Sequence, residues 1–138
     1  MDVNTILTTN KGKINFLKGL IRLAKCDGDL PEEELAFYQS AANSMGLGEE
    51  EQELINDMKN SREKIDIDFE TNKEKMFFLI QAVQLCWIDN KYVDSERREM
   101  RLIVNELGIS MDALEKVEKW VSEGIEWNKR GDELLELK

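Results

Sequence analysis

Apolar residues recur every three or four positions along most of this chain, which is the spacing of one face of an α-helix. Glycine, proline and clusters of short polar residues interrupt that spacing and mark the ends of the predicted helices. Helices are predicted over about residues 13–26, 31–45, 49–58, 73–88, 92–107, 110–121 and 124–138, with at most a short helix before residue 12.

The segment over about residues 60–72 departs from that pattern. It is polar and charged, and its apolar residues are Ile65, Ile67 and Phe69. Their alternation is typical of a strand, but it lasts five residues and no other segment offers a partner strand. We therefore predict a linker with apolar anchors, in an all-α fold of about seven helices that forms one domain over residues 1–138.

An internal repeat appears when the chain is compared with itself at the offset that aligns Phe16 with Phe78. Gly46 and Gly108 then correspond, and each precedes an aliphatic residue, which predicts a helix C-cap at both positions. Two helical-hairpin units are therefore predicted, at about residues 13–59 and 73–121, related by an approximate two-fold axis. A final helix at about residues 124–138 follows. The identical pairs are Phe16 and Phe78, Leu17 and Leu79, Leu23 and Leu85, Asp27 and Asp89, Glu34 and Glu96, Asn43 and Asn105, and Gly46 and Gly108.

Each unit contains an acidic turn between its first two helices, which we call the first corner (residues 27–34) and the second corner (residues 89–96). Both begin with an aspartate, and both place a glutamate seven positions later. The residue after the aspartate is Gly28 in one corner and Asn90 in the other. Because these two residue types best tolerate the left-handed conformation, each is predicted to end its helix.

The net charge of −10 and the 35% of charged residues narrow the range of partners. A field of this sign repels nucleic acid and anionic lipid and attracts cations and basic proteins. No apolar stretch approaches the ~20 residues that span a bilayer, and residues 1–30 lack the order of a signal peptide. We expect a cytoplasmic protein with a protein partner, and neither nucleic-acid binding nor direct membrane insertion.

The chain resembles the TerB-like domain family over about residues 13–121. That family includes bacterial tellurite-resistance TerB proteins and the N-terminal domain of a membrane-anchored DnaJ-like co-chaperone. The resemblance implies an all-helical fold of two repeats and an acidic surface that binds metal ions or partner proteins in bacterial stress-response systems. Asn90 and Lys91 depart from the family pattern, which favours the first corner for binding. The matching residues are Ala24-Lys25-Cys26-Asp27-Gly28-Asp29-Leu30, Glu34 and Met45-Gly46-Leu47, with a divergent second copy at residues 89–96.

The carboxylates of the corners are candidate ligands for a divalent cation, because Ca²⁺ and Mg²⁺ prefer oxygen ligands. Two structural alternatives stay open: Asp27 accepts hydrogen bonds from the next helix, and Glu34 complements the helix dipole or pairs with a lysine. The spacing does not match an EF-hand, since Glu32 stands where the turn glycine belongs. The candidate ligands are Asp27, Asp29 and Glu34 in the first corner, and Asp89, Asp94 and Glu96 in the second.

Other kinds of site have little support in the sequence. The chain has no histidine and only two cysteines, which disfavours zinc and histidine-based catalysis. Cys26 and Cys86 are expected as small buried hydrophobes, and the three tryptophans as core residues. We predict a non-enzymatic binding module: an acidic adaptor for a protein partner, with a divalent cation as a further ligand. The alternative is a purely structural partner-assembly domain without metal.

Overall fold

The computed structural model describes residues 1–28, 30–58, 61–90 and 92–138, without the side chains of residues 89 and 90. This described part of the chain contains seven α-helices and no strand. The prediction of an all-α fold is therefore confirmed. The helices are α1 (Val3–Ile6), α2 (Asn10–Ala24), α3 (Glu32–Ser44), α4 (Glu49–Met58), α5 (Asn72–Asn90), α6 (Asp94–Glu106) and α7 (Met111–Leu134).

Helices α2 and α5 pack together at the centre of the core. A Cβ atom at Gly19 of α2 would lie 2.3 Å from the ring of Phe78, so the two helices approach as closely as a glycine allows. Phe78 is fully buried, and Phe16 and Phe69 pack against it with ring centroids 6.2 and 5.6 Å away. Phe69 belongs to the irregular segment before α5, which confirms the predicted linker with apolar anchors.

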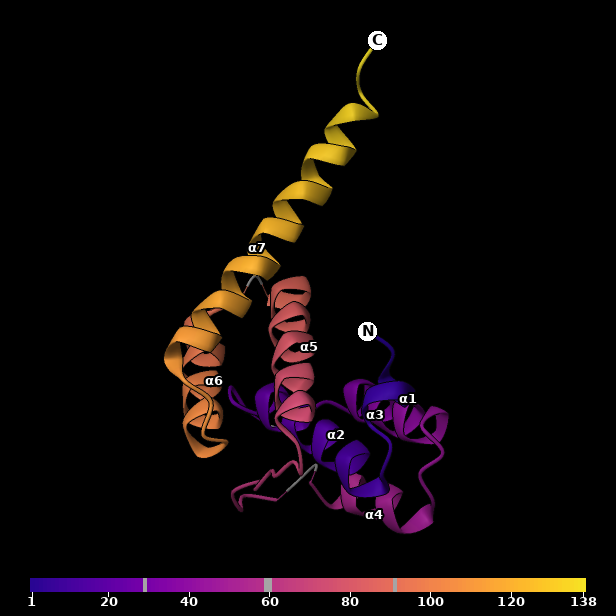
Figure 1. Cartoon of the computed structure of the whole chain (residues 1–138). Coiled ribbons are helices and arrows are strands. Elements are labelled where there is room, and N and C mark those ends of the chain that lie inside the picture. Colours follow the sequence, from indigo (N-terminus) through magenta and orange to yellow (C-terminus); the bar gives the residue numbers. More distant parts are fainter. Residues whose placement is uncertain (29, 59–60, 91) are drawn as a thin grey trace.

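The remaining helices pack around this central pair. Helix α2 also contacts α3, α4 and α6, and α5 also contacts α1 and α7 (Figure 1). The pairing of helices differs between the two predicted units, because α3 packs on α2 in the first, whereas α7 is the helix that packs on α5 in the second. A two-fold relation between complete units stays a prediction.

The helix boundaries and caps nevertheless recur at the offset that aligns Phe16 with Phe78. At that one offset, the first residues of α2, α3 and α4 coincide with those of α5, α6 and α7, and the last residue of α3 coincides with that of α6. Gly46 and Gly108 have φ of 78° and 74°, and the residue after each donates its N–H to the carbonyl oxygen five positions earlier. This is the hydrogen bond of a Schellman cap, so the predicted C-caps at both glycines are confirmed.

One long-range hydrogen bond also recurs at that offset. The Lys13 ammonium group donates to the carbonyl oxygen of Met45 at 3.0 Å, and the Lys75 ammonium group donates to that of Leu107 at 2.9 Å. Each lysine thus satisfies a carbonyl at the C-terminal end of a helix, where the helix dipole favours positive charge. The bond ties the first helix of each unit to the end of its second.

Gly28 takes a positive φ as expected, but the predicted helix ends at Gly28 and Asn90 are wrong. Helix α2 ends at Ala24, and Gly28, with φ of 149°, lies in the turn beyond it. Helix α5 runs through Asn90, and the positive φ, 60°, is found at Tyr92. Tyr92 is held there because it is buried and because the guanidinium group of Arg97 lies 4.1 Å from the centroid of its ring.

The two helices predicted at residues 110–121 and 124–138 form the single helix α7 instead, and the chain continues through Gly124 without a break. Figure 1 shows that the last half of α7 extends away from the other helices. We call residues 1–121 the body and residues 122–138 the projecting part. Across the described residues, no helix is both long enough and apolar enough to span a membrane.

Candidate functional site

The structure brings three of the predicted ligands to one small cavity. Asp27 and Glu34 of the first corner and Glu96 of the second line this cavity, whose volume is about 60 Å³. The two corners therefore meet, although they are far apart in the sequence. Asp94 is exposed in the first turn of α6. Asp29 and the side chain of Asp89 lie outside the described residues.

Glu96 and Glu34 occupy the same position in their helices, but only Glu96 can cap the start of its helix. The buried carboxylate of Glu96 accepts a hydrogen bond from the N–H of Val93 at 3.1 Å, which caps the start of α6. The residue that corresponds to Val93 is Pro31, and proline has no N–H to donate. Glu34 therefore cannot form the equivalent bond, and its side chain is exposed at the edge of the cavity.

The corner carboxylates do not form a metal site in the described part of the chain. Among the side chains that the structure places, no three Asp, Glu or Cys side chains come together closely enough to hold an ion. A calcium site needs six or more oxygen ligands around one point, whereas these carboxylates only border a common space. Because Asp29 and the side chain of Asp89 lie outside the described residues, a divalent-cation site at the corners stays a prediction.

A buried arginine links the first unit to the second. Arg22 donates from Nε to Glu99 at 2.6 Å, from a terminal nitrogen to Glu106 at 2.5 Å, and from the other to the carbonyl oxygen of Ile65 at 3.3 Å. Burial lowers the pKa of Arg22, but the hydrogen bonds to both glutamates outweigh burial and the pKa is raised. Hydrogen bonding to Arg22 lowers the pKa of Glu106, which also pairs with Lys64. This network is structural, because its charges are matched.

Helices α3 and α4 lie in an acidic stretch of the chain. Residues 30–58, which contain both helices, include eight acidic residues and no basic residue. A polar groove of about 540 Å³ lies between the two helices, and we call it the acidic groove. No side chain that lines it is positively charged. The lining residues are Gln39, Asn43, Leu47, Gly48, Glu49, Gln52, Glu53 and Asn56.

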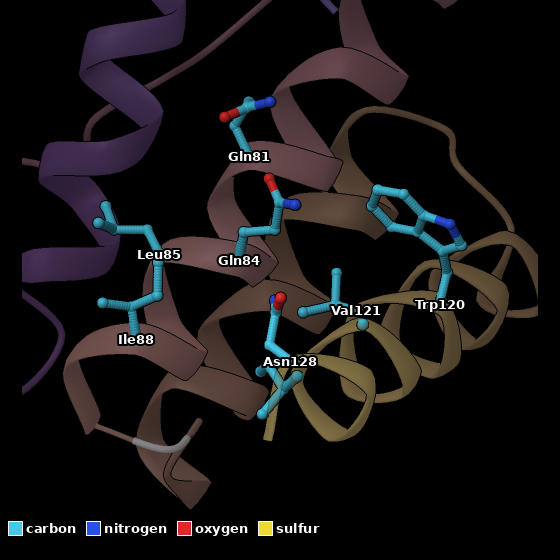
Figure 2. A pocket seen from close by; sticks show the side chains of 9 residues that line it. Gln81, Gln84, Leu85, Ile88, Trp120, Val121 and Asn128 are labelled. Atoms are coloured by element: carbon cyan, nitrogen blue, oxygen red, sulfur yellow. The ribbon is translucent and has the colours of Figure 1, made fainter. Parts of the chain in front are cut away.

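A second groove, of about 380 Å³, lies between α5 and α7, and we call it the uncharged groove. Figure 2 shows side chains of α5 on one wall and side chains of α7 on the other. None of them is charged, although 35% of the residues in the chain are. The lining residues are Gln81, Gln84, Leu85 and Ile88 of α5, and Trp120, Val121, Gly124, Ile125 and Asn128 of α7.

The prediction that all three tryptophans are core residues is wrong for α7. Trp120 is 51% exposed and Trp127 is 70% exposed, whereas Trp87 lies partly buried beside Tyr92. Trp120, Trp127 and Leu134 follow one another at intervals of seven residues, which places them on one side of α7. That spacing is visible in the sequence, and it would have identified an exposed row once α7 was recognised as one helix.

No family model, no curated protein and no solved structure matches this chain. The resemblance to TerB-like domains therefore stays a prediction, and the functional proposals below rest on the geometry and charge of the described residues.

Proposed function

We propose that this protein is a non-enzymatic binding module whose acidic groove takes a basic segment of a protein partner. The observation that carries the proposal is the run of eight acidic and no basic residues over residues 30–58, on two adjacent helices with a groove between them. Opposite charges on a partner would speed association and select against acidic competitors.

The side chains that line the acidic groove support a peptide or helix as its ligand. Glu49 and Glu53 project into it from successive turns of α4, and the amides of Gln39, Asn43 and Gln52 supply both donors and acceptors. Lysine and arginine side chains can therefore pair with carboxylates while amide groups bind the backbone of the partner. Glu34 of the first corner is exposed near the start of α3, but it lines the small cavity between the corners and not the acidic groove.

A non-enzymatic role is supported by the chemistry of the residues. The chain has no histidine, which removes the most common general base. The cavity between the corners has a volume of about 60 Å³. Ligand pockets usually begin at roughly 300 Å³, so the space where the corner carboxylates meet is too small for a substrate, although the two grooves are larger.

A divalent cation is not part of this proposal, since the described carboxylates do not converge. Calcium or magnesium at about 1 mM is expected to leave the melting temperature of chelator-stripped protein unchanged. This concentration is on the order of the dissociation constants of the weakest calcium sites in proteins. A rise that Asp27→Asn together with Glu34→Gln abolishes would restore the ion as a ligand of the first corner.

The binding proposal is tested with the full chain and a lysine-rich helical peptide as the probe. We expect affinity that falls steeply as salt increases, and a loss of about tenfold or more when Glu49→Gln and Glu53→Gln are combined, since charge-assisted pairs contribute more than ~1 kcal/mol. The matched control is Glu133→Gln with Glu136→Gln, which changes the net charge equally at exposed positions at and just beyond the end of α7.

The control variant should retain the affinity of the wild type within about twofold, because a general charge effect at that distance is screened. Equal losses in both variants would show that only net charge matters and would contradict a specific groove. In native cells, a partner recovered by the wild-type protein and lost with the Glu49 and Glu53 variant would identify the natural ligand.

A further inference from the structure

We propose that the projecting part of α7 is a self-association surface, which lies antiparallel along α7 of a second copy and covers its uncharged groove. This inference goes beyond the binding role proposed above, because it concerns α5 and α7 rather than α3 and α4.

One face of α7 continues from the body into the projecting part without interruption. In the body, that face consists of Leu114, Val117 and Val121, which are buried with at most 8% exposure. At the same alternating intervals of three and four residues, the face continues through Gly124, Asn128, Gly131 and Leu135. This is the spacing of a heptad repeat, although only Leu135 of these four residues is a large apolar residue. The first half of the seam is covered by the body, and the second half is uncovered.

Large apolar side chains lie in the uncovered half of the seam or beside it. Trp127 is 70% exposed, Leu134 is 65% exposed and Leu135 is 81% exposed, on a helix whose residues are all exposed from Glu123 onward. A fully covered tryptophan buries about 150–250 Å². Together with Trp120 and Ile88 at the uncharged groove, these side chains offer an area on the order of the ~800 Å² per partner that a standard interface buries.

Of the two orientations of a second copy, the charges favour the antiparallel one. Successive residues of an α-helix are rotated by about 100° around its axis. This rotation places most charged side chains of the projecting part on the face opposite the seam, and Asp132 is the exception near the seam. The body carries 16 basic and 24 acidic residues, so two bodies side by side would repel each other. Antiparallel helices place the bodies at opposite ends of the pair.

The same orientation also makes the surface complementary to itself. The uncharged groove lies at the base of the projecting part, and the exposed leucines lie at its tip. When the helices cross near Asn128, the tip of each copy reaches the groove of the other, and both grooves are covered by one two-fold arrangement.

Two glycines in the seam are consistent with close approach of a second helix. A Cβ atom at Gly124 or Gly131 would meet nothing within 4 Å in the single chain, so neither glycine is required by the packing of the described residues. Each costs the helix about 1 kcal/mol relative to alanine.

Analytical ultracentrifugation of the full chain tests the proposal. The wild-type protein should shift from monomer to dimer as its concentration increases, and Trp127→Glu should remain monomeric with unchanged helix content. The control is Lys129→Gln, which makes the same change in net charge on the opposite face of α7 and should still dimerise. A monomeric wild type at every concentration would overturn the proposal, as would dimers of Trp127→Glu or loss of the dimer in both variants.

Oxidative cross-linking then tests the orientation, in a background with Cys26→Ser and Cys86→Ser. A cysteine introduced as Asn128→Cys should cross-link two copies, because it lies at the proposed crossing point. A cysteine introduced as Leu135→Cys should not, since antiparallel helices separate the two copies of that position by about 20 Å. Efficient cross-linking through Leu135→Cys, or none through Asn128→Cys, would contradict the antiparallel arrangement.

Discussion

The covered half and the projecting part of α7 carry one continuous line of helix positions in two different situations. In the body, the apolar face of α7 packs against α5 and α6, and Leu114 is 2% exposed. In the projecting part, Leu135 belongs to the same face and is 81% exposed. Helical stability in proteins comes chiefly from covering such a face. The comparison shows that the periodicity of a sequence identifies the face but does not identify what covers it.

The largest effect on stability is expected at the centre of the body. Phe78→Ala should lower the free energy of unfolding by about 3–5 kcal/mol, because it leaves a cavity where α2 and α5 meet. Urea denaturation of dilute protein measures this change. A loss below about 1 kcal/mol would contradict the tight contact between Gly19 and the ring of Phe78.

The buried arginine comes next in the order of expected effects. Arg22→Met should cost about 2–3 kcal/mol, because Glu99 and Glu106 lose their shared partner while water can still reach both carboxylates. The change is measured by urea denaturation at neutral pH. Arg62→Met, at a nearby exposed position, is the control. This variant should change the free energy of unfolding by less than about 0.5 kcal/mol, as is usual for exposed positions.

The contribution of Glu106 to the free energy of unfolding should depend on pH. Its pKa is held below the ordinary value of 4.5, first of all by the hydrogen bond from Arg22, so the folded state binds the proton less readily than the unfolded chain. The stabilisation is therefore complete above that ordinary value and is lost as the pH falls through the lowered pKa. Glu106→Gln should be less stable than the wild type by about 1 kcal/mol at pH 7. The difference should shrink in acid, and a deficit that stays constant down to pH 3 would contradict this cause.

The smallest effect is expected in the projecting part. In dilute protein, Leu134→Ala should change the free energy of unfolding by less than about 0.5 kcal/mol, since its side chain is 65% exposed in the single chain. Leu114→Ala, the matched change on the covered half of the same helix, should cost about 2–4 kcal/mol. Similar losses at the two positions would show that the projecting part is covered within a single chain.

Local sequence rules predicted much of the fold. The helix ends at Gly46 and Gly108 followed from glycine before an aliphatic residue, and both Schellman caps are present. The same rules misplaced the end of α5, because burial and the contact with Arg97 hold Tyr92 at positive φ. They also divided α7 at Gly124. A glycine inside a helix costs only about 1 kcal/mol, which the helix-forming residues on both sides offset.

The candidate sites were harder to predict from local sequence rules than the helices, because the sites depend on how the helices pack. The sequence named Asp27, Glu34 and Glu96, but only the packing of the helices shows that they border one cavity. Their different roles were readable in advance, since Val93 has an N–H that Glu96 can cap and Pro31 has none for Glu34. The uncharged groove could not be predicted locally, because its walls come from α5 and α7, whose contact is long-range.

In the proposed dimer, the projecting part of α7 is the uncovered half of an interface. Hydrogen exchange along α7, measured at low and high protein concentration, is the most direct test of this proposal. Amides of residues 111–121 should be protected equally at both concentrations, because the body covers that half of the helix. Amides of residues 123–134 should exchange rapidly in dilute protein and become protected as the concentration increases. Protection of residues 123–134 that does not change with concentration, whether high or low, would contradict the account.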